Sequence, residues 1–223
     1  MKELLITQKW LEDNDINDFL WEGSISEKYK ELLNLPIQKF INKLINLKNI
    51  DIEEEYLNKL KDLDTADTII GYALDRKHCV EYAIYAAEKV LPKFEYEYNN
   101  SIAKQILSEG KSWLKNPNMK FTKFNYRKFF DGTDSKDEYT IYPFMTIIAI
   151  ATKKNYKAKF EGWSYRIADI AINLIGSYPY DKKLTMLDVL NNTRDIISFG
   201  LKLYKNQIKE NELIKNQENT ISK

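Results

Sequence analysis

The sequence predicts an all-α protein, arranged as a multi-helix bundle or as a solenoid-like stack of helical hairpins. Apolar residues recur at helical spacing along most of the 223 residues. Seven glycines and five prolines are too few for an all-β fold with many tight turns. Because 43% of the residues are hydrophobic, the chain has enough apolar side chains to fill a core.

The first part of the chain is expected to contribute two helices. Residues 36–45 carry one apolar stripe, and Pro36 stands just inside the start of that helix, where its missing N–H costs nothing. The segment 53–63 has a similar stripe, which includes Leu57, with charged residues between the apolar ones. We therefore expect each of these helices to bury one face.

A longer helix is expected over residues 66–91, where apolar residues again recur at helical spacing. Asp64 or Thr65 can serve as its N-cap, because both side chains accept hydrogen bonds from backbone N–H groups. Pro92 is expected to end or kink this helix, because proline removes a backbone hydrogen bond.

The second half of the chain is expected to hold four more helices and one long irregular region. The first of these helices runs from a cap at Asn100 or Ser101 to Pro117, and residues 116–140 then break the helical pattern. From about residue 210 the chain is rich in polar residues and is expected to fray. The other three helices are expected over 143–153, about 159–177 and about 184–209.

These elements predict a single all-α domain over residues 1–209 and a frayed tail at 210–223. Within the domain, a helical part at 1–65 precedes a second part at 66–209. The net charge of +1 hides an asymmetry, because residues 1–75 carry 9 basic and 16 acidic side chains, a net of −7. The acidic side chains are either ordinary solvated helix faces or a surface that attracts a basic partner.

The single cysteine, Cys79, and the single histidine, His78, exclude a disulfide scaffold and a zinc finger. We expect no metal or other cofactor, and we expect Cys79 to be a small core residue. No apolar stretch is long enough for a secretory signal or a membrane-spanning helix. The sequence therefore predicts a cytoplasmic protein without a membrane partner, and it leaves the oligomeric state open.

Three ionisable residues on the 66–91 helix form a candidate catalytic or metal site. Glu81 and Glu88 are seven residues apart and share a helix stripe, and His78 precedes Glu81 by about one turn. A carboxylate–histidine group of this kind can act as an acid–base pair. The alternative, which we favour, is that His78 lies at a helix surface and that the glutamates are solvated or paired with lysines.

Basic and aromatic residues alternate over 104–128, a pattern that is typical of a nucleic-acid-binding surface. Single-stranded nucleic-acid binders use cations for phosphates and rings for stacking bases. The alternative is a loop that buries its aromatic side chains and leaves its lysines in water. The basic residues of this candidate surface are Lys115, Lys120, Lys123, Arg127 and Lys128.

The string ALDRKHCVEYAIYAAEKVLPKFEYEYNNSIAKQILSEGKSWL at residues 73–114 resembles the immunity protein family of bacterial polymorphic toxin systems. In that family a helix with a cysteine and alanines ends in a Val-Leu-Pro-x-Phe-Glu element, and a second helix ends near a tryptophan. The resemblance makes residues 66–209 the family-like part of the chain, and its motif residues are expected to keep the fold. They are Cys79, Val90, Leu91, Pro92, Phe94, Glu95 and Trp113.

The resemblance implies a non-catalytic, all-α immunity protein that binds and neutralises a cognate protein toxin. The acidic first third of the chain is the expected contact surface, because charge complementarity speeds association with a basic partner. A nucleic-acid-binding helical protein that uses residues 104–128 is the alternative function. The expected partner-binding residues are Asp13, Asp15, Asp18, Glu53, Glu54 and Glu55.

Overall fold

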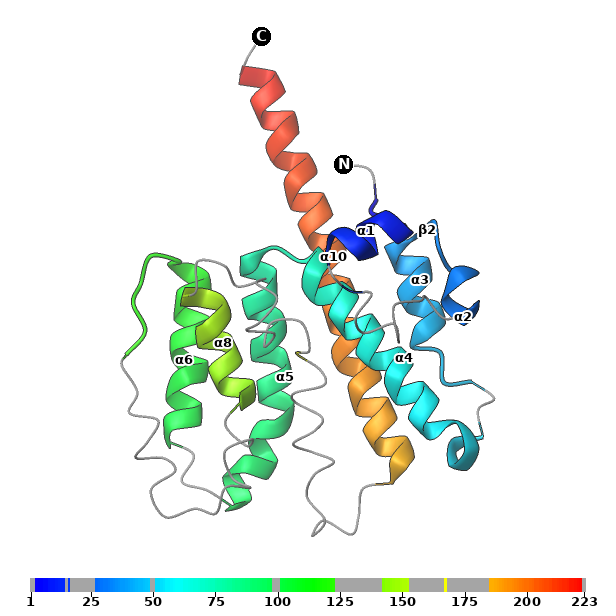
Figure 1. Ribbon diagram of the computed structural model, residues 1–223. Coiled ribbons are helices and arrows are strands. Elements are labelled where there is room, and N and C mark those ends of the chain that lie inside the picture. Colours follow the sequence, from blue (N-terminus) through cyan, green and yellow to red (C-terminus); the bar gives the residue numbers. More distant parts are fainter. Residues whose placement is uncertain are drawn as a thin grey trace.

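The computed structural model confirms the all-α fold class, with helices packed against one another and a very small two-stranded sheet (Figure 1). It describes residues 3–14, 16, 27–48, 51–97, 101–122, 142–152, 167 and 185–221. The elements in chain order are β1 (Leu5–Ile6), α1 (Gln8–Asp13), α2 (Glu27–Lys30), β2 (Leu35–Pro36), α3 (Ile37–Leu44), α4 (Ile52–Ala73), α5 (Arg76–Glu97), α6 (Ser101–Lys115), α8 (Tyr142–Thr152) and α10 (Met186–Ile221).

Helices α4, α5 and α10 form the centre of the molecule. Gly200 of α10 lies so close to α4 and α5 that a Cβ atom placed on it would be 2.7 Å from Ile70 Cγ2 and 2.9 Å from Tyr82 Cζ. Further along α10, the Gln207 amide donates to the Ala73 carbonyl at 3.2 Å. Because α4 and α10 meet at later residues of both helices, they run parallel, as Figure 1 also shows.

Helices α6 and α8 pack on the side of α5 that lies away from α4 (Figure 1). Gly110 of α6 makes a similarly close approach, because a Cβ atom there would lie 2.8 Å from Ile147 Cγ2 and 3.2 Å from Ile84 Cδ1. The predicted helix over 143–153 is confirmed as α8, and its Phe144 and Ile147 are buried. A second glycine contact thus fixes the spacing of α5, α6 and α8.

The N-terminal part is attached to both α4 and α10. Strands β1 and β2 pair antiparallel, with Leu5 opposite Pro36. The backbone N–H of Leu4 donates to the Tyr204 hydroxyl of α10 at 3.1 Å. Lys59 of α4 donates to the Leu44 carbonyl at the end of α3, at 3.3 Å, and so satisfies one of the carbonyls that a helix end leaves open.

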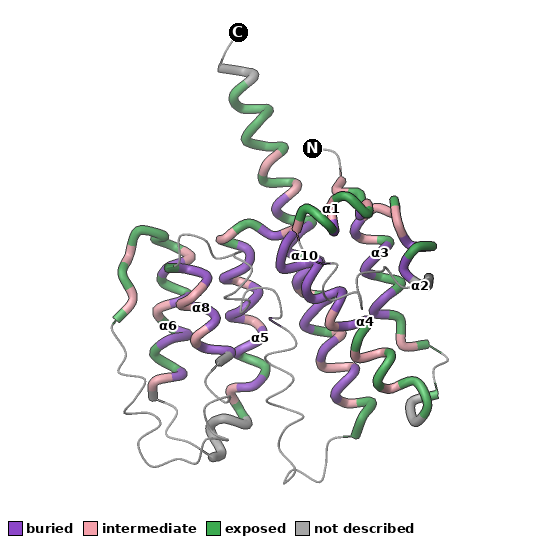
Figure 2. The backbone as a smooth tube through the Cα atoms, in the orientation of Figure 1, coloured by how far each residue is buried: buried purple, intermediate pink, exposed green. Residues whose placement is uncertain are grey.

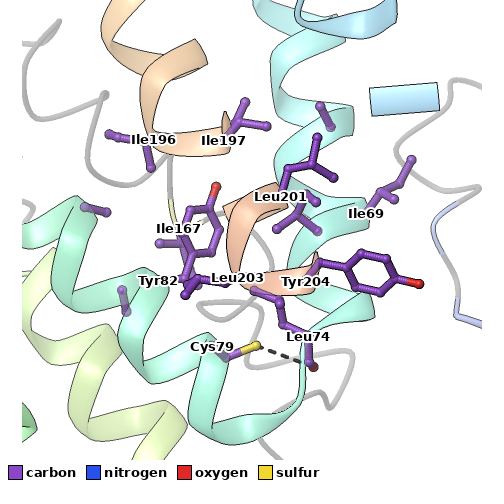
Figure 3. Packing of buried hydrophobic residues seen from close by; sticks show 14 of the residues in the cluster. Ile69, Leu74, Cys79, Tyr82, Ile167, Ile196, Ile197, Leu201, Leu203 and Tyr204 are labelled. Carbon is purple, nitrogen blue, oxygen red and sulfur yellow. Dashed lines mark hydrogen bonds between the residues drawn. The ribbon is translucent and has the colours of Figure 1, made fainter. Parts of the chain in front are cut away.

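The buried side chains of these elements form one hydrophobic cluster (Figures 2 and 3). Figure 3 shows Tyr82 of α5 together with Ile197 and Leu201 of α10 in this cluster. Cys79 is confirmed as a core residue, and its Sγ donates to the carbonyls of Gly71 at 3.4 Å and Leu74 at 3.7 Å. None of the helices described in the structure is long and apolar enough to cross a membrane.

The prediction of one helix over 66–91 is wrong, because the helical conformation is interrupted at Leu74 and Asp75, between α4 and α5. Asp64 and Thr65 do not cap a helix, since both lie inside α4. The helix that does begin here starts after Asp75, whose carboxylate accepts from the backbone N–H of His78 at 3.0 Å. The apolar residues keep their helical spacing across this interruption, so their pattern does not reveal it. The sequence signal for the start of α5 is Asp75, a residue type that favours the N-cap position.

Pro92 does not end its helix, because α5 continues past it to Glu97. Pro92 is exposed, so the carbonyl that loses its hydrogen bond lies in an outer turn where water can donate to it instead. Of the other family-motif residues, Val90 and Trp113 are buried and Leu91 is half-buried. The side chains of Phe94 and Glu95 lie outside the described part.

The remaining helix predictions differ from the structure mainly at their ends. The helices expected over 36–45 and from 100 or 101 to 117 are present as α3 and α6. Pro36 is the N-cap residue immediately before α3, whereas it was expected just inside the helix. The helix expected over 184–209 continues to Ile221, so the tail is helical where fraying was expected. Good helix formers such as Glu, Lys, Leu and Gln explain this continuation. The helix expected over 159–177 lies outside the described residues.

Candidate functional site

His78 is the centre of a polar cluster that joins the α4–α5 break to α10. Its side chain is 2% exposed, so the expectation that it lies at a helix surface is wrong. The Nδ1 atom lies 2.9 Å from Asp75 Oδ1, and the Nε2 atom lies 3.8 Å from Glu210 Oε1. Lys77 pairs with the same Glu210 at 3.0 Å. The histidine is therefore enclosed by contacts that hold three segments together.

Asp75 makes most of the hydrogen bonds in this cluster. Its backbone N–H donates to Gln207 Oε1 at 2.8 Å, and its carboxylate accepts from both the backbone and the ring of His78. Partial burial acts to raise the pKa of the Asp75 carboxyl, but the hydrogen bonds from His78 outweigh burial and leave this pKa below its ordinary value. The cluster thus favours the ionised carboxylate, as a helix cap does.

The structure does not bring His78, Glu81 and Glu88 together as a catalytic site. Glu88 Oε1 forms a 2.6 Å ion pair with Lys111 of α6, while His78 contacts Asp75 and Glu210. Within the described ranges, no group of three or more His, Cys, Asp or Glu residues is arranged to hold a metal ion. His78 and Glu88 are instead used in contacts between helices.

Two buried pairs of a carboxylate and a phenol lie along α4. Tyr82 Oη donates to Asp67 Oδ1 at 2.7 Å, and Tyr29 Oη donates to Asp62 Oδ1 at 2.8 Å. Burial raises the pKa of Tyr82 well above its ordinary value, and the charge of Asp67 raises it further. Asp62 also pairs with Lys59 at 3.2 Å. Each buried carboxylate is thus stabilised by donors.

The candidate nucleic-acid surface is only partly described. Lys115 and Lys120 are exposed, but Trp113 is buried and Phe121 is half-buried against the core. These two rings therefore do not present free faces on which bases could stack. Lys123, Arg127 and Lys128 lie outside the described residues.

The predicted acidic surface is split between two places. Asp13 is exposed on α1, and Glu54 and Glu55 are exposed on the first turns of α4. Figure 1 shows α1 near the end of α4 and the first turns of α4 at the opposite end of that helix, so these carboxylates do not form one face. Asp15 and Asp18 lie outside the described residues, as does the side chain of Glu53.

Sequence analysis missed an exposed apolar residue beside Glu54. The helical stripe at 53–63 predicts that Leu57 is buried, but its side chain is 69% exposed. Tyr56 and Leu60 of the same segment do pack against the core, so α4 is rotated such that Leu57 falls outside the buried stripe. The signal for this was the excess of apolar residues over what one helix face can bury.

Comparison with known proteins finds no match: no protein-family model, no curated protein and no solved structure matches the chain.

Proposed function

We propose that this chain is a non-catalytic immunity protein that binds a cognate bacterial toxin and neutralises it by covering the toxin's active surface. The proposal starts from the resemblance of residues 73–114 to the immunity protein family. The observation that carries it here is the pair Glu54 and Glu55, which are exposed at the start of α4 and form no ion pair within the described part of the chain. Unpaired surface carboxylates attract a basic partner and speed its association.

The contacts of the ionisable residues elsewhere support a binding role. His78 and Asp75 bond to each other, Glu88 pairs with Lys111, and Cys79 is buried in the core. Each of these groups stabilises the junction of two or more helices. Surface residues can therefore be substituted without disturbing these junctions. This property suits a protein whose surface must match that of a partner.

Co-expression tests this proposal. The chain is produced in a bacterial host together with the product of the neighbouring gene, and cell survival and complex formation are measured. We expect the chain to restore growth and to form a complex that survives gel filtration. The double variant Glu54→Gln, Glu55→Gln is expected to associate about tenfold more slowly at low salt. The double variant Asp195→Asn, Glu218→Gln on α10 removes the same charge and serves as the control.

The proposal is contradicted if the neighbouring product is harmless to the host, or if it kills cells that contain the chain. Binding of single-stranded oligonucleotides with a steep salt dependence would instead favour the alternative function at residues 104–128.

A further inference from the structure

The buried side chain of His78 lies between two carboxylates that come from different parts of the chain. Its Nδ1 atom lies 2.9 Å from Oδ1 of Asp75, immediately before α5, and its Nε2 atom lies 3.8 Å from Oε1 of Glu210 on α10. The histidine side chain is 2% exposed, whereas each of the two acidic side chains is 49% exposed. Each ring nitrogen therefore faces one carboxylate, and the two carboxylates belong to opposite sides of the α5–α10 contact.

The distances and the state of Asp75 define where the protons of this ring are. Partial burial acts to raise the pKa of the Asp75 carboxyl, but the hydrogen bonds from His78 leave it below its ordinary value, so near neutral pH this carboxyl has no proton to donate. The 2.9 Å contact therefore needs a proton on Nδ1 of His78. In the neutral ring Nε2 then has only a lone pair, which faces another acceptor, Oε1 of Glu210. A second proton can bind only at Nε2.

The other charges around His78 are few in the part of the chain that the structure describes. The end of α4, over residues 68–73, and the whole of α8 contain no charged side chain. On α5, Arg76 and Lys77 stand in the same first turn as His78, and Lys77 pairs with Oε2 of Glu210, the oxygen that does not face the ring. On α10, Gln207 is neutral and bonds to the backbone of Asp75. Glu210 can thus bind Lys77 and a protonated His78 at the same time.

We propose that His78 is a pH-sensitive switch, in which uptake of a proton at Nε2 fastens α10 to the α4–α5 junction and loss of that proton loosens α10 at Glu210. The imidazolium donates to Asp75 through Nδ1 and to Glu210 through Nε2, and such charge-assisted hydrogen bonds are stronger than neutral ones. The neutral ring forms only the first of these bonds. The switch is independent of the proposed function, because none of its residues belongs to the expected toxin contact.

Glu210 marks the point at which α10 leaves the other helices. Figure 1 shows the last turns of α10 projecting beyond them, and residues 212–218 are all exposed. A short helix without packing is only marginally stable in water, so these turns depend on how firmly α10 is held at Glu210. Protonation of His78 therefore extends the stable part of α10 toward its C-terminal end.

Amide hydrogen exchange of α10 tests the switch. The protection of residues 207–214, corrected for the intrinsic effect of pH on exchange, is measured from about pH 8 to about pH 5, the range in which histidine side chains take up a proton. We expect protection in wild type to rise about fivefold toward the acidic end. Glu210→Gln, which leaves Nε2 without a charged partner, should show no such rise. Lys77→Gln is the matched control, because it removes the lysine that shares Glu210 but keeps the histidine contact, so the rise should remain.

The single histidine of the chain also gives an unambiguous spectroscopic signal. NMR of the ring nitrogens distinguishes the tautomers, and we expect the Nδ1–H form at the alkaline end of this range and protons on both nitrogens at the acidic end. An Nε2–H tautomer at the alkaline end, or a ring that stays neutral throughout, would overturn the inference. So would an equal response of wild type and Glu210→Gln in hydrogen exchange, or a rise that Lys77→Gln abolishes. Circular dichroism establishes that both variants are folded.

Discussion

The hydroxyl of Tyr82 on α5 donates to the carboxylate of Asp67 on α4 across 2.7 Å, and neither side chain has any exposed surface. A buried carboxylate is stable only where donors surround it. The ring of Tyr82 also lies against Gly200 of α10. One side chain therefore joins the three central helices through a hydrogen bond on one side and close packing on the other.

Removing the Tyr82 hydroxyl tests this junction. We expect Tyr82→Phe to lower the free energy of unfolding by about 1–3 kcal/mol, because Asp67 loses a donor in a buried place. Urea denaturation followed by circular dichroism gives the value. Tyr85→Phe is the control, because the Tyr85 ring is half-buried and stacks on Phe199 with 4.0 Å between ring centroids. A loss for Tyr82→Phe no larger than for this control would contradict the prediction.

Alkaline titration gives a second measurement on the buried phenols. Burial and a neighbouring carboxylate raise the pKa values of Tyr29 and Tyr82 above the ordinary 10.0. These phenols keep their protons in the folded state at a pH where the unfolded chain has lost them, so the stability they confer declines as the pH rises above about 10. We expect ultraviolet absorbance to show that at least two tyrosines ionise only on unfolding. Ionisation of every tyrosine in the folded protein near pH 10 would refute this.

Gly200 is expected to tolerate no side chain. In Gly200→Ala the new Cβ atom would lie 2.7 Å from a methyl group of Ile70 and 2.9 Å from the Tyr82 ring. The cost of overpacking, about 1–3 kcal/mol, exceeds the gain of about 1 kcal/mol that alanine brings to a helix. Thermal denaturation should show a lower midpoint than for wild type, whereas the exposed Ser198→Ala on the same helix should show an equal or higher one. An unchanged midpoint for Gly200→Ala would contradict the prediction, because it would mean that the helices can move apart to admit the methyl group without a loss of stability.

Asp75 should stabilise the protein in a pH-dependent way. The His78 hydrogen bonds hold the pKa of this carboxyl below its ordinary 3.8 despite partial burial. Because the folded pKa is the lower one, the contribution is complete at neutral pH and is lost as the pH falls through that folded pKa. Asp75→Ala is expected to lose about 1 kcal/mol at pH 7, as helix-cap removals do.

The comparison with wild type is made by urea denaturation at pH 7 and below pH 4. The difference in free energy of unfolding between Asp75→Ala and wild type should be smaller at the acidic pH, where the wild-type carboxyl also loses its charge. Asp195→Ala, an exposed change on α10, is the control. A difference that stays constant across this range would show that the charge of Asp75 is not what stabilises the junction.

The helices that local sequence signals define were the predictable part of the fold. The periodic apolar residues of α3, α6 and α8 place them to within one or two residues. The α4–α5 break was missed because the apolar spacing runs through it, and because the contacts that stabilise it come from Gln207, which is 132 residues away from Asp75. Such a contact leaves no local pattern for sequence analysis to use.

The candidate surface was predictable only in its charge. Glu54 and Glu55 are exposed as expected, since charged residues seldom lie in a core. The exposure of Leu57 depends on how α4 is rotated against the helices it packs on, and the parallel direction of α4 and α10 depends on contacts between residues far apart in the chain. Both are properties of the assembled fold, and His78 was misplaced for the same reason, because α10 covers it.

The position of α10 in both the chain and the core has a consequence for biosynthesis. The ribosome makes α10 long after α4 and α5, yet Leu201 and Tyr204 of α10 complete the core that those helices begin. Until α10 leaves the exit tunnel, Ile70 and Tyr82 have no cover on that side. Between the synthesis of α5 and that of α10, the nascent chain therefore exposes an apolar surface of the kind that makes incomplete chains prone to aggregate.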